Sequence, residues 1–286
     1  MNTNEVSKHG YLNSDFKLFH LKDKKAQNFE FHYHDFNKII IFISGKVTYH
    51  IEGKSYELKP WDILLINNHD IHKPVIDPSE VYERIIIWVN FKFIELHNSI
   101  DCNLLTCFNR ATEKRFNLVR LDSDLQTNLK SIIYSLENSI NSNEFGSKLL
   151  SNSLFIQLII YLNRIHIENM YENDPSLSKY DEQICEILEY INSNLYSNLS
   201  VSEISKKFYI SNYHLMHKFK KETGYTVYNY ILQKKLITAK DLIKSGNPIV
   251  KTSLQLGFND YSSFLRSFKK SFGISPKDFQ QNSDYF

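Results

Sequence analysis

The segment Leu215–Gly224, LMHKFKKETG, recurs 49 residues later as FLRSFKKSFG at Phe264–Gly273. Both copies hold a Phe-Lys-Lys run and end on glycine, and farther along Tyr230 aligns with Phe279. Upstream of these segments the offset falls to 48 residues, so one copy has a single-residue insertion there. Insertions are tolerated in turns and not inside packed helices. The chain therefore holds two copies of one structural unit, each with a turn before its basic helix.

The first copy predicts a helix-turn-helix unit. Ser200 is placed to cap one short helix, and Ser211 to cap the next. Leu215 and Phe219 are four residues apart, so both face the inside of the second helix, and Gly224 is a typical residue after a helix end. The repeat thus predicts a short helix, a turn and a second, amphipathic helix.

The second copy predicts the same unit. Pro248 precedes its first helix, and either Asn259 or Asp260 caps its second. Phe264 and Phe268 are the expected buried pair. A helix over residues 228–244, with Ile231, Leu236, Ala239 and Leu242 facing inward, joins the two copies. We therefore predict an all-α domain of two helix-turn-helix units over residues 181–286.

The second helix of such a unit fits the major groove of DNA. Two units on one connecting helix would read successive grooves about 34 Å apart. Residues 199–280 carry 14 Lys and Arg against 5 Asp and Glu, which suits a polyanionic partner. The alternative is a helical bundle whose lysines only solubilise it. We predict contacts with double-stranded DNA from Asn212, Tyr213, Met216, His217, Lys220, Lys221, Tyr261, Ser262, Leu265, Arg266, Lys269 and Lys270.

The first part of the chain has the pattern of strands. Val47, Tyr49 and Ile51 alternate with polar residues, as in a half-buried strand. Short apolar runs rich in isoleucine recur between turn signals from residue 29 to about residue 95. Such spacing favours a β-sandwich or barrel. We predict an α+β multidomain protein whose first domain, residues 1–120, is a β-barrel.

Two helices are expected next. Apolar residues recur every three or four positions from Leu125 to Ile140, and residues 147–168 form a second helix that is apolar on more than one side. That helix is covered either by the barrel or by a second copy of the chain. We predict that residues 121–168 form a helical pair that dimerises, and that the polar residues 169–180 are a linker.

The cellular location follows from what the sequence lacks. The first residues have no apolar core of a signal peptide, and the longest apolar run, Leu154–Leu162, is far short of the roughly 20 residues of a membrane span. The three cysteines match no zinc spacing. We predict a cytoplasmic protein without a membrane partner.

The C-terminal hundred residues resemble the AraC/XylS family of transcription regulators. The resemblance rests on Leu199–Gly224, on Gly257–Tyr261 and on Phe264–Pro276. It implies promoter binding, and it implies that the two second helices face base edges. The chain departs from the family pattern at Lys235, where arginine is usual, and at Thr252–Ser253, where Ile-Ala is usual.

Residues 29–95 resemble the cupin-type sensing domain of that family. His32, His34 and His72 match the histidines of metal-binding cupins, but Lys38 stands in the place of their glutamate. A cation beside a divalent ion is electrostatically adverse. We therefore predict no metal and no cofactor, and a small polar effector such as a sugar. The predicted ligand-binding residues are His32, His34, Lys38, Tyr49, Trp61 and His72.

Three hypotheses follow for the function. The first is an effector-responsive transcription regulator that binds DNA as a homodimer and has no catalytic residues, with a contact to RNA polymerase left open. The second is a metal-dependent cupin enzyme with an accessory DNA-binding module. The third, a partner-binding helical scaffold, leaves the repeated basic helices without a role. The first accounts for both parts of the chain, and we expect no enzymatic activity.

Overall fold

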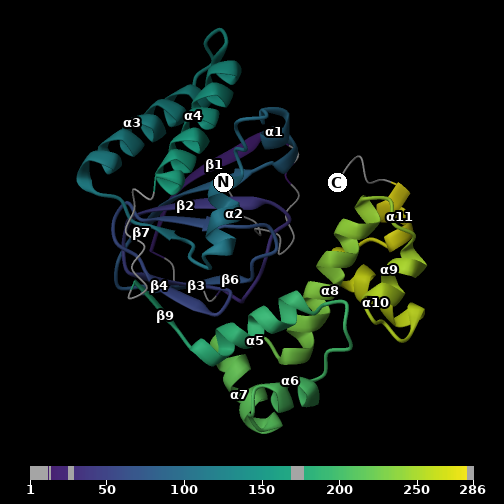
Figure 1. Cartoon of the computed structure of the whole chain (residues 1–286). Coiled ribbons are helices and arrows are strands. Elements are labelled where there is room, and N and C mark those ends of the chain that lie inside the picture. Colours follow the sequence, from purple (N-terminus) through teal and green to yellow (C-terminus); the bar gives the residue numbers. More distant parts are fainter. Residues whose placement is uncertain (1–11, 13, 25–28, 169–176, 282–286) are drawn as a thin grey trace. The chain divides into compact units, whose positions relative to one another are not determined.

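The computed structural model describes residue 12 and residues 14–24, 29–168 and 177–281 (Figure 1). It divides near residue 180 into two compact units. We call the first the β domain and the second the HTH domain. No described helix is long and apolar enough to cross a bilayer.

The described residues of the β domain form two sheets and four helices. One sheet has the order β1-β7-β2-β5-β8 and the other the order β6-β3-β4-β9. The strands are β1 (Phe16–Asp23), β2 (Asn37–Ser44), β3 (Val47–Ile51), β4 (Lys54–Glu57), β5 (Ile63–Ile66), β6 (His72–Ile76), β7 (Tyr82–Val89), β8 (Leu118–Val119) and β9 (Ser178–Tyr180). The helices are α1 (Phe91–Leu96), α2 (Thr106–Glu113), α3 (Ser123–Ile140) and α4 (Ser147–Ile167).

Both sheets bury their side chains in one core. Val47, Tyr49 and Ile51 of β3 point into it, which confirms the alternation seen in the sequence. Leu129 and Leu136 of α3, and Phe155 of α4, join the same core, so the two predicted helices are confirmed and lie against the sheets (Figure 1). The α+β architecture with a cupin-like first domain is as predicted.

Several elements differ from the sequence prediction. Strands begin at Phe16, well before residue 29, because β1 pairs along its whole length with β7. Phe91–Leu96 is helical where strands were expected, and Asn90 caps it by accepting a hydrogen bond from the Lys92 amide. Of the expected linker, residues 169–176 lie outside the described residues, while Ser178–Tyr180 form β9. Pairing with the distant strand β7 decides β1, and the short sequence of that segment does not show it.

Up to residue 281, where the described part of the chain ends, the HTH domain has seven helices. They are α5 (Glu182–Ser193), α6 (Val201–Lys207), α7 (Asn212–Thr223), α8 (Val227–Lys244), α9 (Ile249–Gln255), α10 (Tyr261–Phe272) and α11 (Pro276–Gln281). The helix α8 joins the two helix-turn-helix units, as predicted. Its residue Leu242 is only half-buried and Ile243 takes the buried position. The aligned residues Tyr230 and Phe279 are both buried.

Candidate DNA-binding and effector sites

The second helices of the two units, α7 and α10, begin and end in the same way. The Ser211 hydroxyl accepts a hydrogen bond from the His214 amide, and the Asp260 carboxylate accepts from the amides of Ser262 and Ser263. Gly224 and Gly273 end the helices with positive φ angles of 77° and 75°, which glycine adopts without strain. Both helices are thus held at their two ends by local interactions.

The inner faces of α7 and α10 are fully buried. Leu215 and Phe219 have no exposed surface, and neither have Phe264 and Phe268. Packing of these side chains fixes which face of each helix points outward. The predicted orientation of both recognition helices is therefore present in the structure.

Eleven of the twelve predicted DNA-contacting residues are exposed, and they lie on the outer faces of α7 and α10. Leu265 differs, because it is half-buried and packs against the cluster that contains Phe264 and Phe268. The exposed residues are Asn212, Tyr213, Met216, His217, Lys220, Lys221, Tyr261, Ser262, Arg266, Lys269 and Lys270. The structure thus places a polar and basic face on each helix.

Lysines of α7 divide into two kinds. Lys218 is half-buried, and its amine lies 2.9 Å from the Asp181 carboxylate and 3.1 Å from the Gln183 side-chain oxygen, so it ties α7 to the start of α5. Lys220 and Lys221 instead lie on the exposed face. In the described part of the chain Lys220 has no recorded ion pair. Lys220 and Lys221 are therefore the lysines of α7 whose side chains are open to solvent.

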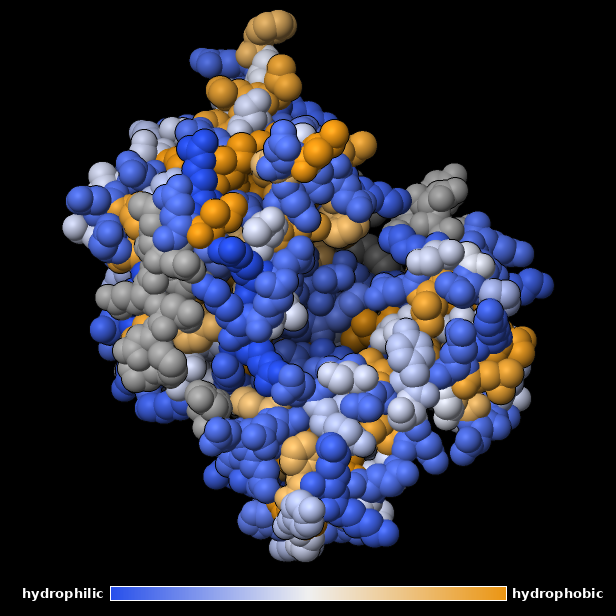
Figure 2. All heavy atoms as spheres, in the orientation of Figure 1, coloured by the Kyte–Doolittle hydropathy of each residue, from blue (hydrophilic) through white to orange (hydrophobic). Residues whose placement is uncertain are grey.

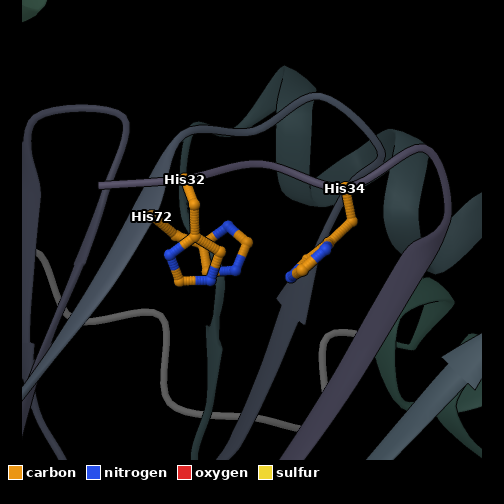
Figure 3. A group of neighbouring side chains, drawn as sticks. All are labelled: His32, His34 and His72. Carbon is orange, nitrogen blue, oxygen red and sulfur yellow. The ribbon is translucent and has the colours of Figure 1, made fainter. Parts of the chain in front are cut away.

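A second candidate site lies inside the β domain. The backbones of His32 and His72 exchange two hydrogen bonds, which brings the segment before β2 beside β6. The imidazole rings of His32 and His72 have centroids 4.5 Å apart, and that of His34 is 5.3 Å from the ring of His72 (Figure 3). One nitrogen from each ring lies within 4.8 Å of the others. We call these three residues the histidine cluster.

Backbone carbonyls orient two of these rings. Nδ1 of His32 lies 2.8 Å from the Glu30 carbonyl oxygen, and Nδ1 of His72 lies 2.8 Å from that of Asp70. A carbonyl only accepts, so both Nδ1 atoms carry the proton in these bonds. In the neutral rings the Nε2 atoms of His32 and His72 are then acceptors.

Lys38 of β2 completes the site. Its amine lies 3.1 Å from Nε2 of His72, and only 6% of the residue is exposed. Burial lowers the pKa of Lys38 from 10.5 to about 7. Burial also lowers the pKa of His72 well below 6.5, and Lys38 and the other two histidines add to that effect. His72 is therefore neutral near pH 7, and Lys38 is close to half-protonated.

The other two predicted ligand-binding residues are placed differently. The Tyr49 ring lies 6.2 Å from that of His72, and burial raises the pKa of its hydroxyl well above 10. The amine of Lys130 on α3 lies over the ring of Trp61, 4.6 Å from the ring centroid. The structure thus joins Tyr49 to the histidine cluster and gives Trp61 a contact with α3.

Two aromatic residues beside the histidine cluster were not predicted. Phe36 stacks on His34 with ring centroids 4.9 Å apart, and Trp88 lies 6.3 Å from His34. Trp88 of β7 is directly opposite Lys38 of β2 in the sheet. The alternation of apolar and polar residues along β7 could have shown which face of the sheet Trp88 occupies. That Trp88 lies opposite Lys38 depends on strand pairing, which the sequence does not show.

Three histidine nitrogens form a donor set that suits zinc or copper. Lys38, however, donates to the same Nε2 atom of His72 that a metal would use, and it adds positive charge. The residues present therefore fit a divalent cation poorly.

Comparisons with known proteins find a match for each of the two domains. Residues 19–159 match the model of the AraC-like ligand binding domain, and residues 204–282 match a helix-turn-helix domain model. The chain is 22% identical over 268 residues to the transcriptional activator RhaS of Escherichia coli, covering 91% of this chain and 90% of RhaS. It is 26% identical over 243 residues to an HTH-type transcriptional regulator of Staphylococcus aureus, of which it spans only 30%.

Among solved structures, ToxT from Vibrio cholerae aligns with 93% of this chain and 98% of its own, at 15% identity and a TM-score of 0.35. The two domain models cover separate parts of the chain, with the ligand-binding domain before the helix-turn-helix domain. The chain belongs to the AraC family of transcriptional regulators.

Proposed function

We propose that this protein is a DNA-binding transcription regulator whose β domain senses a small molecule. The observation that carries the proposal is the pair α7 and α10, two helices with matched caps, buried inner faces and exposed basic outer faces. A helix of this kind reads bases in the major groove while lysines hold the phosphates. We also propose that the protein is cytoplasmic, because a regulator of this kind must reach promoter DNA.

The test is a selection from random duplex DNA with the full chain, repeated at several salt concentrations. We expect a motif of two boxes about one helical turn apart, and an affinity that falls steeply with salt. A parallel selection with Phe219→Asp and Phe268→Asp, each of which breaks one unit, should lose one box each. Recovery of no motif with or without candidate effectors would contradict the proposal.

We propose that the effector binds at the histidine cluster with Lys38 and Tyr49. The support is that five polar side chains gather at one place in the β domain, and that four of them, all but His32, are buried. The effector would shift the packing of the sheets against α3 and α4, and so change how the HTH domain is held. To do so it must bind the DNA-competent and DNA-incompetent states with different affinity. An effector that left DNA affinity, DNA geometry and transcription all unchanged would disprove this coupling.

We propose that the protein is a homodimer through α3 and α4. Leu149 and Leu150 of α4 are 73% and 54% exposed, Tyr134 of α3 is 68% exposed, and Phe145 between the helices is fully exposed. Such apolar surface is typical of an interface. Leu149→Glu with Leu150→Glu should give a monomer in sedimentation experiments, whereas Leu96→Glu on α1 should not. A dimer that survives the double change would contradict this interface.

A metal-dependent cupin enzyme is the competing function, and it would use the same three histidines. Lys38 speaks against it, as does membership of a family of regulators. Metal analysis of the purified protein separates the two, because an enzyme of this kind would hold about one ion per chain.

We also propose RNA polymerase as a partner of the protein, and a pull-down on promoter DNA would test this contact.

A further inference from the structure

Tyr209 lies in the turn between α6 and α7 with a backbone angle that few side chains adopt. Its φ is +53°, in the left-handed region, where glycine is unstrained but a bulky residue is not. The second unit has Gly257 at the aligned position, 48 residues later, with a φ of +67°. Both turns therefore need the left-handed conformation, and the first unit forms it with the less suitable residue.

The side chain of Tyr209 contributes little packing to the folded domain, because it is 97% exposed. The residues on either side of it, Phe208 and Ile210, are half-buried, and the Phe208 ring lies 5.7 Å from that of Tyr190 on α5. These neighbours hold the turn in place. Backbone strain that brings no packing in return is typical of residues that contact another molecule.

The surroundings of Tyr209 suit a polyanion. The sequence from residue 204 to residue 221 holds five lysines and no aspartate or glutamate. Lys206, in the last turn of α6, is exposed, and the surface over α6 and α7 is mostly hydrophilic (Figure 2). At the position aligned with Lys206 the second unit has Leu254. The combination of an exposed lysine and an exposed tyrosine before the basic helix is thus particular to the first unit.

Tyr209 also lies close to the end of α7 that would enter the major groove. It comes two residues before Ser211, the residue that caps α7, and two residues span at most about 7 Å. The phosphates of the DNA border that groove, and tyrosine hydroxyls are among the groups that donate hydrogen bonds to phosphate oxygens.

We propose that the Tyr209 hydroxyl donates a hydrogen bond to a DNA phosphate at the edge of the box that α7 reads. This inference rests on the proposed DNA-binding function, and it adds a contact beyond the twelve residues that the sequence predicted. Gly257 has no side chain, so the second unit lacks this contact. The first unit therefore binds its box through one more phosphate than the second.

The test measures the affinity of the full chain for the selected DNA motif. Tyr209→Gly and Tyr209→Phe should each bind about tenfold more weakly than the parent, because both lose a hydrogen bond to a charged group. The control is Tyr228→Phe, which changes a 67% exposed tyrosine of α8 beyond the other end of α7, and its affinity should equal that of the parent.

Thermal unfolding separates a DNA contact from a structural role. Tyr209→Gly removes the backbone strain, so its melting temperature should not fall below that of the parent although its DNA affinity falls. A lower melting temperature would mean that the tyrosine is needed to hold the turn, and it would overturn the proposal.

Methylphosphonate substitutions, each of which neutralises one phosphate, locate the contact. One of them should weaken binding by the parent but not by Tyr209→Gly, and it should flank the box that Phe219→Asp loses. Equal affinity of parent and Tyr209→Gly, or of parent and Tyr209→Phe, would overturn the proposal. Reduced transcription at unchanged DNA affinity would do so too, because it would place the tyrosine on a protein partner. A parent that binds no duplex would overturn the proposed function as well, so the two failures are distinguishable.

Discussion

The amine of Lys38 lies 3.1 Å from Nε2 of His72 inside the β domain, and a backbone carbonyl holds the opposite nitrogen of that ring. The two residues are 34 positions apart in the chain and belong to different sheets. Neither can be charged cheaply, because both are buried. Their burial makes the stability of the domain depend on pH.

Lys38→Met should stabilise the ligand-free protein at neutral pH. The pKa of Lys38 is about 7 in the folded chain and near 10.5 in the unfolded chain. Between these two pH values the unfolded chain therefore binds more protons than the folded chain. The free-energy cost of burying the charged amine is fully present below pH 7 and vanishes as the pH approaches 10.5. Each pKa unit corresponds to about 1.4 kcal/mol.

Urea unfolding of the parent and of Lys38→Met at several pH values between 6 and 9.5 checks this. The difference in the free energy of unfolding should shrink as the pH rises. Lys17→Met on the exposed side of β1 is the matched control and should show a constant difference. A pH-independent difference for Lys38→Met would mean that the lysine is already neutral, or already charged, throughout this range.

Thr252→Val should stabilise the second helix-turn-helix unit. Thr252 is fully buried in α9, and its hydroxyl has no hydrogen-bond partner in the described part of the structure. Leaving a buried polar group unpaired costs about 1–3 kcal/mol, and valine has nearly the same shape. The neighbouring Ser253 is the comparison, because its hydroxyl donates to the Val250 carbonyl and Ser253→Ala loses that bond.

Chemical unfolding of the HTH domain in the full chain gives the free energies for both variants. We expect Thr252→Val to raise the value by about 1 kcal/mol and Ser253→Ala not to raise it. A lower value for Thr252→Val would show that the hydroxyl has a partner, such as a bound water.

Arg266→Ala should relax the sequence preference at one base pair. Arg266 is 79% exposed on α10, and its guanidinium lies 3.8 Å from the Asp260 carboxylate that caps the helix. Loss of a bidentate contact to guanine costs about 1–3 kcal/mol. Binding to a set of single-base variants of the selected motif measures the effect, with Lys92→Ala on α1 as the control. An equal loss of affinity for every DNA sequence would mean that Arg266 contacts a phosphate and not a base.

Lys220→Ala combined with Lys269→Ala should weaken the salt dependence of DNA binding. These two lysines hold the same position in the two units and both are exposed. Each phosphate contact contributes close to one unit to the slope of log K against log salt. The slope should therefore fall by about two units, with the base preferences unchanged. Lys46→Ala with Lys92→Ala, from the β domain, should leave the slope as it is.

Much of the HTH domain could be predicted from the sequence. Its caps, its buried pairs such as Leu215 and Phe219, and its exposed lysines all come from interactions within a few residues of each other, and the repeat supplied each signal twice. The exception, Leu265, is half-buried because a neighbouring cluster reaches it.

The β domain was predictable in class but not in detail, because strands are completed by distant partners. The spacing of apolar residues could show that buried side chains alternate along β3. It could not show that β1 pairs with β7, or that the Lys130 amine lies over the Trp61 ring. The family, the two helices α7 and α10 and the polar residues of the candidate site could all be predicted from residue order alone. The buried contact between Lys38 and His72 could not, because burial and strand pairing, which set the charge of that amine, exist only in the folded chain.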